Sequence, residues 1–385
     1  MRTIGVVTVG RSDYGILRPL LRRIAADGDL ELRLYVSGAH LVPAHGSTVE
    51  EIEADGFPIS ARVELLSDSD SPRGAADAIG RGVQGFAEVF DRDPPDLLLL
   101  LGDRFEMLAA GVAALPLRIP LAHVHGGESS EGAFDESIRH ALTKLSHLHF
   151  ASAEPHARRI LQLGEERWRV TVSGAPGLDA IDELEPLDEE ELERRVGIAL
   201  DSPPLVVTYH PATLDAGDVQ TRAAELVAAV DAAGLPAIFT APNADPGGEA
   251  IRGLIGDYVG DRSDARLVQS LGSRAYFSLL RRAAAMVGNS SSGIIEAPSL
   301  RLPVVNIGTR QEGRLRAANV IDVGDDRTAI LDGIRRAVSP GFRTGLRDLV
   351  NPYGDGRAGE RIVKRLREVE LGPRLIVKRF HDLDA

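Results

Sequence analysis

Short apolar runs alternate with longer amphipathic stretches along nearly the whole chain. In the first half, runs that predict strands lie at residues 3–9, 30–36, 97–101, 121–125 and 148–151. In the second half, runs of the same kind lie at residues 205–209, 237–240, 266–268, 285–288 and 303–307. The stretches between them have the spacing of helices. Runs that are apolar throughout predict strands buried on both faces, as in a parallel sheet covered by helices.

The alternation occurs twice, and we therefore predict an α/β fold of two Rossmann-like, doubly wound domains. A chain of 385 residues allows this, because single cores stop growing at roughly 250–300 residues. We place the first domain at residues 1–175, with the junction near residues 173–177. The acidic run 188–193 then predicts a solvated helix face at the start of the second domain.

Composition narrows the classes of function. The net charge of -13 argues against non-specific binding to nucleic acid or to an anionic membrane. No apolar run approaches the ~20 residues that a membrane span needs, and the N-terminus enters a strand without a signal-peptide pattern. The chain has no Cys, which excludes disulfides, thiolate nucleophiles and cysteine metal sites. We expect a cytoplasmic protein that binds any anionic ligand locally.

A turn rich in glycine and serine follows the run 285–288, at residues 288–293 (GNSSSG). Glycine lets the backbone approach a ligand, and Ser290 and Ser291 stand where a helix would begin. The N–H groups and the dipole of a helix N-terminus favour an anion. Glu296, about one turn further on, could reach a sugar hydroxyl. The turn indicates a nucleotide sugar, although an ordinary capped helix after a buried strand is the alternative.

Ionisable residues gather near the ends of the strands predicted in the first half. They are, in chain order, Arg11, Asp103, Arg104, His125, Glu128 and Asp135. Ligands of doubly wound sheets bind at the carboxyl ends of the strands, where arginines suit phosphate and the other groups suit acid–base chemistry. His123 and His125 could alternatively share a strand face and hold a metal, but we favour acid–base work. The first turn lacks the GxGxxG pattern, which weakens a dinucleotide interpretation.

The second half places polar residues at the corresponding positions. His210, Asn243 and Arg310 each follow a predicted strand. His210 precedes a proline, which keeps it out of helical geometry, so its side chain could point into a ligand site or bond to backbone. Asn243 could contact a uracil or a ribose. Each signal is weak alone, but together they put a polar or cationic group at nearly every strand end.

These motifs together resemble the UDP-N-acetylglucosamine 2-epimerases, and specifically the hydrolysing branch that makes N-acetylmannosamine and UDP for sialic acid and related nonulosonic acids. The resemblance covers nearly the whole chain and rests on seven ordered motifs, at residues 11–15, 102–104, 125–128, 135–140, 210–213, 288–293 and 308–311. It implies a GT-B-like architecture with UDP in an inter-domain cleft. It also implies a second domain at 176–355 and a C-terminal segment, 356–385, whose helix returns to the first domain.

Carried over by motif, the resemblance implies a set of UDP ligands. They are Arg11, His210, Asn243, Ser290, Ser291, Glu296 and Arg310, with Arg104 near the diphosphate. It implies Asp103 and Asp135 as acid–base groups. Some relatives have a carboxylate where this chain has His125, so both His125 and Glu128 remain candidates.

The implied reaction eliminates UDP while C2 loses a proton, which gives a 2-acetamidoglucal. Water then adds at C1, and a proton returns to C2 from the opposite face. Such chemistry needs two differently placed acid–base groups. It needs no cofactor, and no metal if arginines neutralise the diphosphate. We expect a small-molecule nucleotide sugar as ligand and a homo-oligomer, a dimer.

Four alternatives stay open at this point. Within the family, the enzyme could be non-hydrolysing and return UDP-N-acetylmannosamine, or it could hydrolyse the UDP-linked diacetylated 6-deoxy sugar of legionaminic acid synthesis. A GT-B glycosyltransferase would bind UDP in the same way but pass the sugar to an acceptor. A nucleotide-sugar sensor would bind without chemistry, which the side chains of Asp103 and Asp135 argue against.

Overall fold

The computed structural model describes residues 1–42, 48–66, 71–129, 135–211, 219–241, 248–260, 262–269 and 271–382. They form two units. Unit 1 comprises Met1–Ala180 with Tyr353–Ala385, and unit 2 comprises Ile181–Pro352. The chain therefore passes from one unit to the other twice, a few residues away from the junctions expected at 175/176 and 355/356.

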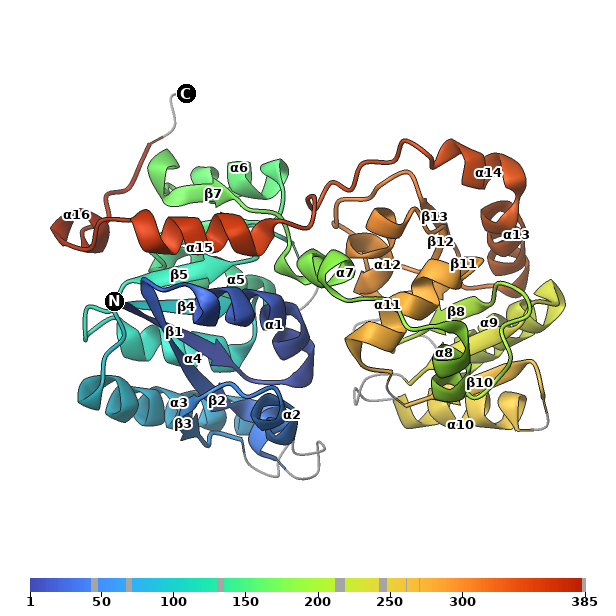
Figure 1. Ribbon diagram of the computed structural model, residues 1–385, viewed down its shortest axis with the longest axis horizontal. Helices are drawn as coiled ribbons and strands as arrows, with labels where there is room; N and C mark the ends of the chain where they lie inside the picture. Colours follow the sequence, from blue (N-terminus) through green and yellow to red (C-terminus); the bar gives the residue numbers. More distant parts are fainter. Residues whose placement is uncertain are drawn as a thin grey trace. The chain divides into compact units, whose positions relative to one another are not determined.

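Unit 1 is built around a seven-stranded parallel sheet with the order β3-β2-β1-β4-β5-β6-β7 (Figure 1). Its strands are β1 (Arg2–Thr8), β2 (Leu30–Ser37), β3 (Ile59–Val63), β4 (Leu97–Leu101), β5 (Leu121–Val124), β6 (Leu148–Ala151) and β7 (Val170–Val172). The strand order reverses between β1 and β4. Doubly wound sheets bind ligands beyond the carboxyl ends of the strands at such a reversal.

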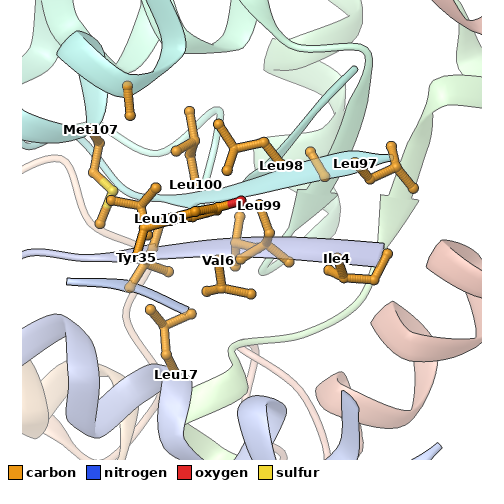
Figure 2. Close-up of a cluster of buried hydrophobic side chains, with 14 of the residues drawn as sticks. Ile4, Val6, Leu17, Tyr35, Leu97, Leu98, Leu99, Leu100, Leu101 and Met107 are labelled. Carbon is orange, nitrogen blue, oxygen red and sulfur yellow. The ribbon is translucent and has the colours of Figure 1, made fainter. Parts of the chain in front are cut away.

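The helices of unit 1 connect these strands. They are α1 (Arg11–Ala26), η1 (Gly38–Leu41), α2 (Val49–Ala54), α3 (Pro72–Arg92), α4 (Phe105–Ala114), α5 (Asp135–Leu145), α6 (Glu154–Gln162), η3 (Arg167–Arg169), η4 (Pro176–Leu178), α15 (Ala358–Glu368) and α16 (Pro373–Ile376), while α7 (Asp179–Glu183) spans the first junction. Figure 2 shows Leu17 of α1 and Met107 of α4 on opposite sides of β1 and β4. All five leucines of β4 are buried, because helices cover both faces of this strand.

The C-terminal segment is part of the core of unit 1. Ile362 and Leu366 of α15 are fully buried in the same hydrophobic cluster as the strands. The Asp179 carboxylate accepts hydrogen bonds from the N–H groups of Ala358 (2.9 Å) and Gly359 (2.7 Å) and so satisfies the start of α15. Further on, the buried Arg169 guanidinium donates to the carbonyls of residues 374, 375 and 377 at 2.9–3.0 Å.

A buried carboxylate, that of Glu165, also holds the C-terminal segment in place. Glu165 accepts hydrogen bonds from Lys144 (2.6 Å), Lys378 (2.9 Å) and the buried His149 (3.0 Å). Burial alone would raise the pKa of Glu165, but these donors hold it at about 2. Because the folded pKa lies below the ordinary 4.5, this group stabilises the fold above about pH 4.5, and the contribution is lost as the pH falls towards 2.

We expect Glu165→Gln to lower the free energy of unfolding by about 3 kcal/mol at pH 7, because it leaves partly buried lysines without their counter-charge. Urea unfolding followed by circular dichroism measures the loss. The difference from the unmodified protein should shrink as the pH approaches 3. The exposed Glu370→Gln is the control and should change stability by less than about 0.5 kcal/mol. Equal stability of the two variants would refute the role of Glu165.

Unit 2 contains a six-stranded parallel sheet with the order β10-β9-β8-β11-β12-β13 (Figure 1). Its strands are β8 (Leu205–Thr208), β9 (Ala237–Thr240), β10 (Ala265–Val268), β11 (Ala285–Gly288), β12 (Val304–Ile307) and β13 (Val320–Val323). Its helices are α8 (Glu189–Val196), α9 (Val219–Ala233), α10 (Gly248–Val259), α11 (Gly272–Arg282), α12 (Ser291–Ile295), η5 (Ala297–Leu300), α13 (Arg327–Val338) and α14 (Pro340–Gly345). Here the strand order reverses between β8 and β11, so the residues that follow these two strands lie at the reversal.

All ten strands predicted from the apolar runs are present, with ends that shift by at most one residue. Sequence analysis missed β3, β7 and β13, which lie at sheet edges and are only partly buried. An edge strand needs no continuous apolar run, so its signal merges with that of a loop. No helix in the described ranges is both long and apolar enough to span a membrane.

Candidate functional site

The turn after β5 has an unusual backbone. His125 adopts a left-handed φ of 63° and Gly127 a φ of 76°. A methyl group at Gly127 would lie 2.3 Å from the carbonyl oxygen of His156, so only glycine fits against α6. Because β5 ends at Val124, His125 has left the strand. His123 and His125 therefore do not share one strand face, which the metal-binding alternative required.

His123 has a structural role within unit 1. Its Nε2 donates to the Gly102 carbonyl at 2.7 Å, and Nδ1 lies 3.2 Å from the Thr143 hydroxyl. Burial lowers the pKa of His123 to about 3, so the ring is neutral. Within the described parts of the chain, no three His, Asp or Glu side chains group as metal ligands would.

Two predicted carboxylates, Asp103 and Asp135, have different surroundings. Asp103 follows β4 and forms an ion pair with Arg139, whose side chain is only 4% exposed and which also donates to the His125 carbonyl at 2.8 Å. Asp135 is the first residue of α5, and burial followed by the nearby charge of Asp103 raises its pKa. One carboxylate thus has a bound cation while the other is pushed towards its protonated form. Such a pair is suited to separate base and acid roles.

His125 and Glu128 form a third buried group. The His125 Nδ1 and the Ser152 hydroxyl both lie 2.5 Å from Oε1 of Glu128. His156 lies behind Ser152, with its Nδ1 2.9 Å from the Ser152 oxygen. The structure therefore brings together the two candidates that the sequence left open, and it adds two side chains that sequence analysis did not identify.

Arg11 and Arg104 stand at the starts of helices in unit 1. Arg11 is the first residue of α1 and is exposed. Arg104 donates to the fully buried Glu106 at 2.7 and 3.1 Å while its side chain stays 44% exposed. Asp13 lies beside them and accepts from the Thr8 hydroxyl (2.7 Å) and the Val9 N–H (2.9 Å). Burial raises the pKa of Asp13 to about 6 despite these bonds and the nearby Arg104.

In unit 2, Asn289 holds two loops together at the ends of β8 and β11. Its side chain accepts from the His210 N–H at 2.7 Å and donates to the His210 carbonyl at 2.8 Å. Its own carbonyl accepts from Arg310 (3.1 Å) and Gln311 (2.8 Å). Burial, with a smaller contribution from Arg310, lowers the pKa of His210 to about 4. His210 and Arg310 therefore lie close together, with His210 neutral at pH 7.

The serine turn follows β11. Gly288 has a φ of 132°, and a methyl group there would lie 1.9 Å from the Thr208 carbonyl oxygen. Ser290 is the N-cap of α12 and accepts from the Ser292 N–H at 3.3 Å. Helix α12 has five residues, so Glu296 lies at its C-cap rather than inside a longer helix. The prediction that Ser290 caps a helix is confirmed, whereas the helix itself is shorter than expected.

The remaining predicted residues are Ser291 and Asn243. Ser291 is the first residue of α12, next to the cap. Asn243 lies outside the described residues. Sequence analysis had included Arg139 and Asn289 in its motifs without assigning them a role. The signal for both was available, because a cation beside a strand-end aspartate and an amide directly after a strand are the groups that hold such loops in place.

Comparison with known proteins identifies the family. A family model described as UDP-N-acetylglucosamine 2-epimerase matches residues 22–367. The chain is 39% identical over 379 residues to a UDP-N,N'-diacetylbacillosamine 2-epimerase (hydrolyzing) of Legionella pneumophila, which covers 98% of this chain and 99% of that protein. It is 33% identical over 387 residues to a UDP-N-acetylglucosamine 2-epimerase of Neisseria meningitidis, which covers 100% of both chains.

Solved structures agree on the fold. The UDP-GlcNAc 2-epimerase from Neisseria meningitidis bound to UDP-GlcNAc superposes with a TM-score of 0.80 at 18% identity and covers 95% of this chain and 99% of that one. A Staphylococcus aureus MnaA-UDP co-structure superposes with a TM-score of 0.77 at 20% identity, covering 95% and 96%. The architecture is therefore α/β and GT-B-like, and the chain belongs to the UDP-N-acetylglucosamine 2-epimerase family.

Proposed function

We propose that this protein is a hydrolysing 2-epimerase of a UDP-linked 2-acetamido sugar. The substrate and water give UDP and the free sugar with inverted C2. The observation that carries the proposal is the pair of carboxylates in unit 1, where Asp103 is bound to Arg139 and the pKa of Asp135 is raised. A reaction that takes a proton from C2 and returns one from the opposite face needs a base and an acid in different positions.

The two half-reactions use these groups differently. C2 of an acetamido sugar is a weak acid, so we propose that UDP departs as the C2 proton is removed and a 2-acetamidoglucal forms. Water then adds at C1 while an acid protonates C2 from the other face. Asp103 and Asp135 are our candidates for the proton transfers, and either His125 or Glu128 assists. This set gives the reaction one carboxylate paired with an arginine and one carboxyl group whose pKa is raised.

The residues of unit 2 suit the nucleotide. We propose that UDP contacts His210, Arg310, the serine turn and Glu296, with Asn243 in addition, and that Arg11 and Arg104 of unit 1 stabilise the departing diphosphate. Charge grows on that group in the transition state, and preorganised arginines and N–H groups stabilise such charge most effectively. This chemistry requires neither a cofactor nor a metal ion.

The choice of sugar is guided by the relatives. Sequence analysis expected UDP-N-acetylglucosamine as substrate and N-acetylmannosamine as product. The Legionella relative at 39% identity is named as an epimerase of UDP-N,N'-diacetylbacillosamine. A Campylobacter jejuni relative, 40% identical over 323 residues, is named for the GDP- and UDP-linked forms of the same sugar. We therefore propose UDP-N,N'-diacetylbacillosamine as the first substrate to test and UDP-N-acetylglucosamine as the second.

Incubation with each UDP-sugar in the absence of an acceptor, followed by proton NMR, tests the proposal. A hydrolysing epimerase gives free 2-epimer and UDP in equal amounts. A UDP-linked epimer would show the non-hydrolysing reaction instead. Free sugar with unchanged C2 would indicate a glycosyltransferase that hydrolyses its donor slowly, and no turnover of either compound would contradict both substrate assignments.

We expect Arg310→Ala and His210→Ala to weaken UDP binding by about tenfold each. A charged hydrogen bond to phosphate is worth roughly 1.5–3 kcal/mol, part of which water replaces. Isothermal titration with UDP measures the effect. The exposed Arg335→Ala in α13 is the control and should bind UDP like the unmodified protein. Unchanged affinity in both test variants would defeat the assignment of the nucleotide site.

A further inference from the structure

We propose that Ser152 and His156 act as positioning residues for the acid–base pair of His125 and Glu128, by fixing the Glu128 carboxylate through a directed chain of hydrogen bonds. The inference rests on the proposed function, because it concerns the same turn. It adds two residues that lie outside the motif 125–128. They come from the end of β6 and the first turns of α6.

The contacts converge on one carboxylate oxygen. Oε1 of Glu128 accepts hydrogen bonds from the Ser152 hydroxyl and from the His125 Nδ1, each at 2.5 Å. The His156 Nδ1 is 2.9 Å from the Ser152 oxygen but 4.0 Å from Glu128. Ser152 therefore stands between His156 and the carboxylate. All four side chains are at least nine-tenths buried, so water does not readily replace a lost bond.

The number of available protons sets the direction of this chain of hydrogen bonds. Ser152 has a single hydroxyl proton, and it is donated to Glu128. The Ser152 oxygen can then only accept from His156, which must carry its proton on Nδ1. Burial lowers the pKa of His156, so the ring is neutral and holds one tautomer. The chain runs from His156 to Ser152 to Glu128, and it delivers a second donor to the carboxylate beside His125.

The His156 ring also packs near an aromatic ring. The Tyr353 ring lies 5.9 Å from it, centre to centre, and is 1% exposed. The Tyr353 carbonyl also accepts from the Ala175 N–H at 2.8 Å, which ties the residue to unit 1. Two cations act on the His156 ring: Arg159, which donates to the Gly127 carbonyl at 2.5 Å, and Arg139. Both cations lower the pKa of His156 and so favour its neutral form.

The chain of hydrogen bonds should affect turnover more than substrate affinity, because it acts on the orientation and proton affinity of the Glu128 carboxylate. Ser152→Ala removes one donor from the carboxylate, which then holds its proton more tightly. We expect kcat to fall about tenfold, KM to change less than threefold, and the acidic limb of the kcat–pH profile to move to higher pH by about one unit. Ser173→Ala is the matched control, because among the described residues its buried hydroxyl has backbone carbonyls as partners, those of Ala151 and Gly174.

Two substitutions of His156 separate the hydrogen bond from the packing. His156→Asn keeps a donor near the position of Nδ1 and should retain most of the activity. His156→Phe keeps a ring against Tyr353 but removes the donor, so it should reproduce the shifted pH profile of Ser152→Ala. If the two His156 variants behave alike, or if Ser152→Ala matches Ser173→Ala in kcat and pH profile, the proposal is overturned.

A measurement that needs no turnover keeps this test apart from the test of the proposed function. Nitrogen-15 NMR of the labelled full chain reports the tautomer of each imidazole. We expect the neutral Nδ1–H form for His156 in the unmodified protein and a changed tautomer signal in Ser152→Ala. An Nε2–H tautomer in the unmodified protein would refute the directed chain even if the enzyme proves to be a hydrolysing epimerase. The expected tautomer in a protein inactive on both UDP-sugars would instead count against the proposed function.

Discussion

Replacing either Asp103 or Asp135 with Asn is expected to lower kcat by about 10²-fold or more, while UDP still binds. Asparagine keeps the size of the side chain but cannot accept or deliver the proton, and a positioned acid or base contributes about that factor. Asp103→Asn also leaves the buried Arg139 without its anionic partner. Steady-state kinetics and titration with UDP measure the two effects separately.

The two variants should differ in stability. Asp103→Asn breaks an ion pair with a nearly buried arginine, so it should be the less stable of the two. Asp135→Asn removes a carboxyl group whose pKa burial already raises, and it should unfold close to the unmodified protein. The exposed Asp91→Asn in α3 is the control for both. Near-normal turnover in both test variants would show that other carboxylates act in the reaction.

Gly288→Ala is expected to have the largest effect on the structure of unit 2. The added methyl group would lie 1.9 Å from the Thr208 carbonyl oxygen, and φ at this residue is 132°. An alanine at this position fits only if the backbone at residue 288 or at Thr208 shifts. Backbone strain and overpacking together should lower the free energy of unfolding by about 4 kcal/mol. The displaced turn contains Asn289 and the capping Ser290. We expect an unfolding free energy lower by about that amount and a loss of UDP binding.

Gly256→Ala is the matched control. This glycine lies in α10 and a methyl group there meets nothing within 4 Å, so alanine should stabilise the helix slightly. Urea unfolding and titration with UDP compare the two alanine variants. A Gly288→Ala protein that unfolds like Gly256→Ala and binds UDP normally would contradict the close contact between β8 and β11.

The sequence predicted the strands of the sheet interiors well, because residues buried on both faces must be apolar throughout, as in β4. It could not predict the edge strands β3, β7 and β13, whose half-exposed residues resemble loops. The same limit applies to His125. Strand periodicity suggested that it continues β5, whereas in the structure it has a left-handed φ of 63° and its Nδ1 lies 2.5 Å from Glu128.

Some residues of the candidate site could be predicted from the sequence in the same way, and others could not. Strand-end residues such as Asp103 and His210 could be predicted, because parallel strands bring their carboxyl ends to one edge. Ser152 and His156 could not, since nothing in their local sequence indicates that they face Glu128. Likewise, a sequence does not show that Asp103 and Asp135 have different electrostatic surroundings, because Arg139 reaches Asp103 only in the folded chain.

The central claim is that C2 is inverted through loss and return of a proton as UDP departs. The direct test is the reaction in D₂O with the UDP-sugar that the enzyme turns over, followed by proton NMR and mass spectrometry of the free sugar. The proposed elimination and addition place one deuterium on C2 of the 2-epimer, because the returning proton comes from solvent, and release one UDP per sugar. An epimerised product with no deuterium at C2 would contradict the account.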